Sequence, residues 1–234
     1  MRFWVLFIVL SPVLLWQARR TRVITPRLPE AKGDAFGLAG PAGHERLRLL
    51  VAGESTAAGV GVQYHHQGLA AQIAAHLRRR HGRPVHWHTI GLNGARAADL
   101  VRHLRKQPGR RLADLVIISL GVNDTVALTS PRRYRRELDT LIATLREQCP
   151  GAPIHLLAVP PMQHFTALPA PLRQLLGLRA ARLDREQQRL CRNSSKVHHV
   201  AFPLIDASGH LAEDGYHPSS KGYQYIGEQV ANRL

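Results

Sequence analysis

The stretch LRLLVAGESTAAGVGV, residues Leu47 to Val62, joins an apolar run to a single acid and a single serine. The run from Leu47 to Ala52 has the length and composition of a buried strand. Glu54 and Ser55 follow it at once, before a segment rich in Ala and Gly. The serine has two interpretations. Its hydroxyl could cap the first turn of a helix, the commoner use at such a junction, or it could be a nucleophile beside free amides that stabilise an oxyanion.

Similar apolar runs recur along the chain and alternate with segments of helical periodicity. The predicted strands after the first cover residues 85–90, 115–120, 154–159 and, more weakly, 197–202. The predicted helices cover residues 68–81, 95–107, 134–148 and 178–193. Strands that alternate with helices form a parallel sheet covered on both faces. The sequence therefore predicts a three-layer α/β/α fold of about five parallel strands, which binds ligands at the carboxyl ends of its strands.

The composition favours one globular domain with anionic neighbours. The chain has 234 residues, of which 44% are hydrophobic, and its formal net charge is +16. Such a charge favours an anionic membrane surface or an acidic acyl carrier protein as partner. No nucleic-acid reading motif accompanies the basic residues, so no nucleic-acid partner is expected.

The cysteines and histidines do not indicate a metal centre. Cys149 and Cys191 form no C-x-x-C pair, and the sequence does not decide whether a disulfide joins them. The fourteen histidines include no H-E-x-x-H motif, and adjacent pairs such as His65 and His66 point apart. We expect neither a metal nor a cofactor.

The N-terminus carries a separate signal. Residues Phe3 to Trp16 are uncharged and apolar, and an arginine cluster follows them. This length suits a signal-peptide core or a short, tilted anchor. We predict an N-terminal membrane anchor or signal-like helix at 1–20, a linker at 21–46 and a catalytic domain at 47–234. The membrane side stays open between the cytoplasmic and periplasmic faces, and secretion after cleavage is the alternative.

Polar groups stand where several of the predicted strands end. Ser55 follows the first strand, Gly94 the second and Asn123 the third, while Asp214 and His217 share one loop near the end of the chain. A serine hydroxyl needs a base to take its proton, and a histidine oriented by a carboxylate is the usual one. The amides of Ser55 and Gly94 and the carboxamide of Asn123 are suitable donors to an oxyanion.

These blocks, in this order, resemble the SGNH (GDSL-type) hydrolase superfamily over residues 47–234. The resemblance implies a flavodoxin-like α/β/α fold with Ser55 as nucleophile, and Asp214 and His217 as acid and base of the triad. It also implies an oxyanion hole of Ser55, Gly94 and Asn123. The segment GESTAAGVGV looks like that of a bacterial esterase and arylesterase subgroup. One departure is Glu54, where the family motif has aspartate.

The expected function is therefore hydrolysis of a small-molecule or lipid acyl ester by a Ser-His-Asp mechanism, as in an esterase or lipase. An acyl thioesterase or acyltransferase using the same site, and a non-catalytic membrane-surface binding protein, are the alternatives. The apolar segment 160–178 contains Met162, Phe165 and Leu168, which we expect to line an acyl pocket. The alternative for this segment is ordinary packing on the sheet.

Overall fold

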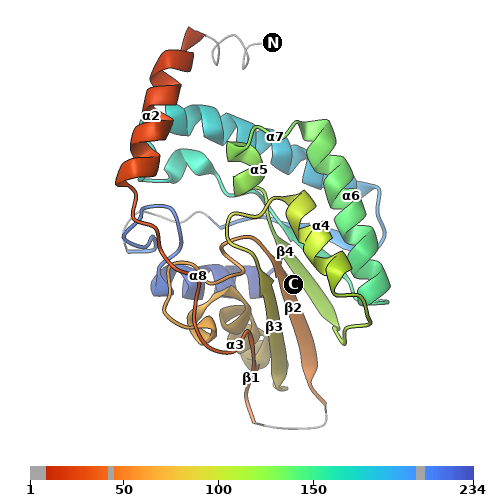
Figure 1. Cartoon of the computed structure of the whole chain (residues 1–234). Helices are drawn as coiled ribbons and strands as arrows, with labels where there is room; N and C mark the ends of the chain where they lie inside the picture. The colour runs from red at the N-terminus through yellow and green to blue at the C-terminus, as the bar shows by residue number, and fades with distance from the viewer. Residues whose placement is uncertain (1–8, 42–44, 204–208) are drawn as a thin grey trace.

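A six-stranded sheet forms the centre of the computed structural model, which describes residues 9–41, 45–203 and 209–234 (Figure 1). The strand order is β1-β3-β2-β4-β5-β6, and only the β1–β3 pair is antiparallel. The strands are β1 Phe36–Ala39, β2 Leu47–Gly53, β3 Val85–Gly91, β4 Leu115–Ser119, β5 Ile154–Leu157 and β6 Val197–Val200. The five predicted parallel strands are thus confirmed.

Helices cover both faces of this sheet, as predicted (Figure 1). Helices α3 (Leu69–His81) and α8 (Ser220–Ala231) contact each other and share one apolar core with the sheet. On the opposite face lie α4 (Ala97–Lys106), α6 (Pro131–Gln148) and α7 (Leu172–Arg192). The shorter elements are α5 (Val122–Val126) and the 3₁₀ turns η1 (His65–Gln67) and η2 (Met162–His164).

Strand β2 shows why the sheet has this architecture. Successive side chains of a strand point to opposite faces. Leu50 and Ala52 belong to the core under α4 and α6, while Leu49 and Val51 belong to the core under α3 and α8. Because both faces are buried from Leu49 onward, this part of the strand is a continuous apolar run rather than an alternating one.

Strand β1 was not predicted, and it lies inside the predicted linker at 21–46. It is a short edge strand that pairs Phe36 with His88 and Ala39 with Val85, and its side chains alternate between exposed and half-buried. Lys32 adds backbone hydrogen bonds, donating to Gln63 O and accepting from the amide of His65. This segment is therefore attached to the domain along much of its described length.

Helix α2 (Ser11–Ile24) contains residues 11–20 of the predicted anchor and packs on the start of α7 (Figure 1). Leu14 is buried there, and the Gln17 side chain donates to Ala170 O at 2.6 Å and accepts from the Leu172 amide at 3.2 Å. Residues 1–8 of the predicted anchor lie outside the described residues. Among the helices described, none combines the length and apolarity that a membrane crossing requires.

Candidate active site

Ser55 lies in a series of turns at the carboxyl end of β2. The amides of Ala57 and Ala58 donate to Glu54 O, and the amide of Val60 donates to Ser55 O. No α-helix starts at Ser55, and its hydroxyl makes no hydrogen bond to another described residue. The helix-cap interpretation of this serine therefore fails. Ser55 is buried, with 8% of the residue's surface exposed.

Two glycines let this turn lie close to the neighbouring strands. A Cβ on Gly53 would lie 2.1 Å from the carbonyl oxygen of Ser119 at the end of β4. A Cβ on Gly91 at the end of β3 would lie 2.1 Å from the amide nitrogen of Ala58. Only residues without a side chain permit these approaches, which bring the Ser55 turn against the ends of two strands.

Glu54 connects the Ser55 turn to Asn123. Its carboxylate accepts hydrogen bonds from the Val122 amide at 2.9 Å, the Asn123 amide at 3.0 Å and Asn123 Nδ2 at 2.6 Å. Asn123 Nδ2 also donates to Ala95 O at 3.2 Å, beside Gly94. Ser55, Asn123 and the Gly94 loop are thereby held at one edge of the sheet.

The environment of Glu54 changes its protonation. Burial raises the pKa of this carboxyl group to about 7, against the opposing effect of the hydrogen bonds from Asn123 and Val122. The nearby charge of Asp124 also raises the pKa. Glu54 is therefore a buried acid that titrates near neutral pH.

The predicted donor amides are open. Neither the Ser55 amide nor the Gly94 amide donates to any residue within the described ranges. Gly94 has a φ of +78°, and a Cβ placed on it would meet no atom within 4 Å. A substrate oxygen could therefore approach this backbone without steric conflict.

His217 and Asp214 form a hydrogen-bonded pair. His217 Nδ1 lies 2.6 Å from Asp214 Oδ2, and Asp214 Oδ1 accepts the amides of Tyr216 and His217 at 2.9 and 3.0 Å. Burial by itself would raise the pKa of Asp214, but these hydrogen bonds outweigh it and hold the pKa below its usual value. Asp214 is thus an ionised carboxylate that accepts Nδ1–H and leaves Nε2 of His217 available as a base.

The Ser55 turn packs against the His217 loop. A Cβ on Gly61 would lie 2.3 Å from Pro218 O and 3.3 Å from His217 Cβ, and Tyr223 Oη donates to Val60 O at 2.7 Å. The structure thus brings the five predicted residues to one edge of the sheet. Glu54 connects Ser55 to Asn123, and the Ala95 carbonyl connects Asn123 to the Gly94 loop. The approach of Gly61 to Pro218 brings the loop of Asp214 and His217 against the Ser55 turn.

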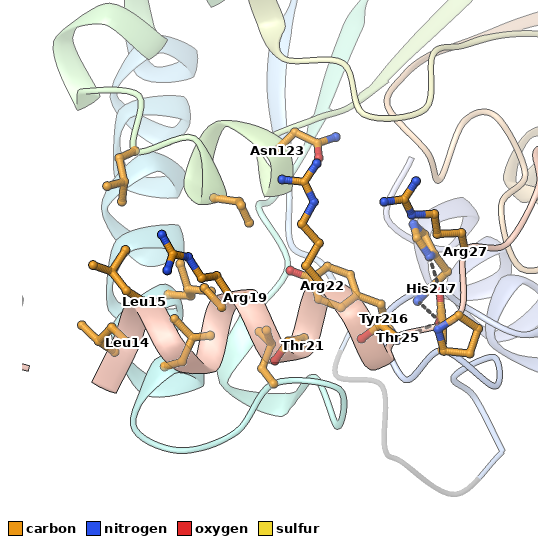
Figure 2. A pocket seen from close by; sticks show the side chains of 18 of the residues that line it. Leu14, Leu15, Arg19, Thr21, Arg22, Thr25, Arg27, Asn123, Tyr216 and His217 are labelled. Carbon is orange, nitrogen blue, oxygen red and sulfur yellow. Dashed lines mark hydrogen bonds and ion pairs between the residues drawn. The ribbon is translucent and has the colours of Figure 1, made fainter. Parts of the chain in front are cut away.

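A cavity of about 840 Å³ opens over Asn123, Asp214 and His217 (Figure 2). Its apolar wall combines residues from α2, from α5 and the turn after it, from the segment before α7 and from the first turns of α7. These are Leu14, Leu15, Val126, Leu128, Leu168, Leu172 and Leu176. Sequence reasoning missed the contribution of α2, because its apolar residues also match a membrane anchor.

The structure places the three residues predicted as pocket residues in the segment 160–178 differently. Leu168 lines the cavity, but Met162 and Phe165 lie in the core under α7 instead. Met162 is fully buried, and the Phe165 ring packs edge-on against Tyr216 with centroids 4.8 Å apart. Phe165 therefore supports a cavity residue without lining the cavity itself.

Residues 51–225 match the model of the GDSL-like Lipase/Acylhydrolase family. The chain belongs to this family. A GDSL-like esterase of Mycobacterium tuberculosis is 27% identical over 233 residues, covering 90% of this chain and 72% of that protein. This member of the family thus has Glu54 at the position where the family motif usually has aspartate.

Two solved structures show the same fold as this GDSL-family chain. The crystal structure of TesA has a TM-score of 0.63 at 21% identity, covering 80% of this chain and 97% of that chain. Est24, a carbohydrate acetylesterase from Sinorhizobium meliloti, has a TM-score of 0.59 at 18% identity, covering 80% and 97% of the two chains.

Proposed function

We propose that this chain is a serine hydrolase of carboxylic acyl esters, with Ser55 as nucleophile and His217 as base. The observation that carries the proposal is the Asp214–His217 hydrogen bond, in a loop that packs on the Ser55 turn. A carboxylate that holds Nδ1–H leaves Nε2 ready to accept the serine proton. The Nε2–Oγ hydrogen bond of such sites often forms only with the substrate bound.

The reaction proceeds in two steps, acylation of Ser55 and hydrolysis of the acyl-enzyme. His217 Nε2 takes the Ser55 hydroxyl proton while Oγ bonds to the ester carbon, and the carbonyl oxygen becomes an oxyanion. When the intermediate collapses, His217 returns the proton to the leaving alcohol and an acyl-enzyme remains. Water, deprotonated by His217, then attacks the acyl-enzyme and releases the acid and the Ser55 hydroxyl.

The oxyanion is stabilised by the Ser55 and Gly94 amides and by Asn123 Nδ2. Asn123 Nδ2 already donates to Glu54 and to Ala95, so one of these two acceptors must give way to the oxyanion. The bond to the Ala95 carbonyl is the longer one, at 3.2 Å, and its acceptor is neutral. The bond to Glu54 is 2.6 Å and is stronger while that carboxyl group is ionised. The N–H that points to Ala95 is therefore the one offered to the substrate.

The experiment that tests this function uses p-nitrophenyl esters of increasing acyl length, together with a fluorophosphonate probe. Wild type should release p-nitrophenol and bind the probe covalently, and Ser55→Ala should do neither. A variant that still reacts with the probe would place the nucleophile elsewhere. A wild-type protein that is folded but inert in both assays would favour a non-catalytic binding protein.

A second candidate is hydrolysis or transfer of a thioester-linked acyl group carried by an acidic acyl carrier protein. The net charge of +16 favours it, because such a carrier would be attracted to this surface. A turnover rate on acyl carrier thioesters well above that on p-nitrophenyl esters of equal chain length would select this candidate.

We further propose that the chain binds an anionic membrane surface through the outer face of α2. That face consists of Val13, Trp16, Arg20 and Val23, and its apolar members are exposed. Arg20 lies over the Trp16 ring, 5.2 Å from its centroid. An exposed helix that combines aromatic, apolar and basic side chains is typical of interfacial binding. Co-sedimentation with anionic vesicles that is lost in Trp16→Ser together with Val23→Ser would support this proposal.

A further inference from the structure

The cavity over the candidate active site has a basic side as well as an apolar one. Arg19 and Arg22 of α2 and Arg27 just beyond its end line the same space as Asn123 and His217. The only acid among the lining residues is Asp214, which is buried and already bound to His217. The described cavity wall therefore carries unbalanced positive charge beside Asn123 and His217.

These three arginines have no partner within the described part of the chain. No hydrogen bond or ion pair joins the side chain of any of them to a described residue. By contrast, Arg48 binds Asp114 and Arg133 binds Glu137. An arginine without a partner beside a cavity keeps its fork of donors for a carboxylate or phosphate group.

Helix α2 separates its side chains by function. Leu14, Gln17 and Thr21 are buried against the domain, and Leu14 and Thr21 also reach the cavity wall. Leu15, Arg19 and Arg22 line the cavity, while Trp16 and Arg20 lie on the outer face. The three sets occupy successive sectors of a helix with 3.6 residues per turn. The docking of Gln17 on Ala170 and Leu172 thus turns Leu15, Arg19 and Arg22 toward the cavity.

The positions of the arginines indicate which part of the ester they contact. Figure 2 shows Arg22 extending from α2 toward Asn123, and Arg27 beside His217, while Leu14 and Leu15 lie toward the other end of the helix. In the proposed reaction, His217 gives its proton to the leaving alcohol. The alcohol part of the ester therefore lies on the side of Arg22 and Arg27, and the acyl chain lies along the leucines.

We propose that the substrate is an acyl ester whose alcohol part carries an anionic group, a phosphate or a carboxylate, which Arg22 and Arg27 bind. This inference rests on the proposed ester hydrolase function and names the substrate class of the same site. The acyl part is accommodated by the apolar wall of the cavity. A neutral ester fits the same space but leaves both guanidinium groups without a partner.

The test compares soluble esters that share one acyl chain. The substrates are hexanoyl glycerol, hexanoyl glycerol 3-phosphate and the hexanoyl ester of 3-hydroxypropanoate, with kcat/KM taken from hexanoate release. Wild type should prefer both anionic esters over the neutral one by about tenfold, the effect expected of hydrogen bonds to a charged group. Preference for the phosphate ester alone, or for the carboxylate ester alone, identifies the anion and supports the proposal.

The variants are Arg22→Gln and Arg27→Gln, with Arg20→Gln as the matched control on the outer face of the same helix. The first two should reduce the preference to near unity, because each removes a guanidinium group from the proposed anion site. Arg20→Gln should leave both the preference and the activity on hexanoyl glycerol unchanged. Arg22→Lys should retain part of the preference, because it keeps the charge without the fork. The preference should also fall as salt concentration rises.

The outcomes separate this inference from the function on which it rests. Equal kcat/KM values of wild type for the charged and neutral esters would overturn the inference and leave the hydrolase function intact. A preference that persists unchanged in both arginine variants would also overturn it. Absence of hydrolysis for these esters and for p-nitrophenyl esters would instead refute the proposed function.

Discussion

Glu54 holds Asn123 by its side chain and its backbone at once. Glu54 Oε2 accepts Asn123 Nδ2 at 2.6 Å and the Asn123 amide at 3.0 Å, while Oε1 accepts the neighbouring Val122 amide. One carboxylate, adjacent to the proposed nucleophile in the chain, thus fixes the proposed oxyanion donor. Glutamate is one methylene longer than the aspartate usual in the family motif, but it still makes this connection.

Replacement of Glu54 by glutamine should lower kcat with little change in KM. Glutamine has one acceptor oxygen where the carboxylate has two, so either the Val122 amide or Asn123 loses its partner and Asn123 is held less firmly. We expect a loss of about tenfold, smaller than the loss of about a hundredfold for Asn123→Ala, which removes an oxyanion donor outright. Glu54→Asp, with the family's own acid, is the control and should retain more activity. An unchanged kcat in Glu54→Gln would show that Glu54 does not position Asn123 for the reaction.

Glu54 should also make stability depend on pH. Its pKa is raised from 4.5 to about 7 in the folded protein, so the folded state binds more protons than the unfolded state between these values. The free energy of unfolding should therefore decline as pH rises from about 4.5 to 7, by up to about 3 kcal/mol from this group. Urea unfolding of wild type and Glu54→Gln at both ends of this range isolates the effect, since other groups titrate alike in both proteins. A constant difference between the two proteins would contradict it.

The two members of the His217–Asp214 pair should behave unequally. In the proposed mechanism His217 moves the proton in both steps, so His217→Ala should reduce kcat/KM almost to the level of Ser55→Ala, and the double variant should be little worse. Asp214 orients the imidazole, so Asp214→Ala should retain more activity. All four proteins are compared on one p-nitrophenyl ester. Additive losses in the double variant would show that Ser55 and His217 do not act as a unit.

Gly61 tests the contact between the Ser55 turn and the His217 loop. A Cβ there would lie 2.3 Å from Pro218 O, and its φ of +100° already disfavours any other residue. Gly109 has a φ of +129°, but a Cβ added to it would meet no atom within 4 Å, so Gly109→Ala carries the backbone strain without the collision. Gly61→Ala should lower both Tm and kcat, while Gly109→Ala should lower Tm only slightly and keep kcat. Equal kcat in the two variants would mean that this contact does not position the base.

The parallel sheet and the grouping of the five site residues could be predicted from the sequence, for a physical reason. Strands buried on both faces are continuous apolar runs, and in a parallel sheet their carboxyl ends meet at one edge. Ser55, Gly94 and Asn123 follow three such runs. The link through Glu54 could not be predicted, because its hydrogen bonds reach residues almost seventy positions away.

Strand β1 and the docking of α2 could not be predicted, because the local sequence patterns of these two segments are weak or ambiguous. Strand β1 has four residues, and as an edge strand it lacks a continuous apolar run. The contact of Gln17 with Ala170 joins distant segments, whereas the apolar residues around Gln17 equally match a membrane anchor. Apolarity alone likewise did not separate Leu168 in the cavity wall from Met162 in the core.

Removal of residues 1–24 should change chain-length selection rather than abolish catalysis. The deletion takes away Leu14, Leu15 and Arg22 from the cavity wall and exposes Leu172, but it leaves Ser55, Asp214 and His217 in place. We expect KM for p-nitrophenyl octanoate to rise severalfold, because the longer acyl chain loses apolar contacts, each buried methylene being worth about 0.8 kcal/mol. The acetate ester should be hydrolysed with nearly unchanged kcat/KM. Leu15→Ser together with Leu176→Ser, in the full chain, is the matched variant and should reproduce the effect on octanoate while α2 stays docked through Gln17. If the deletion lowered kcat/KM for acetate and octanoate equally, α2 would support the fold of the site and not the acyl pocket.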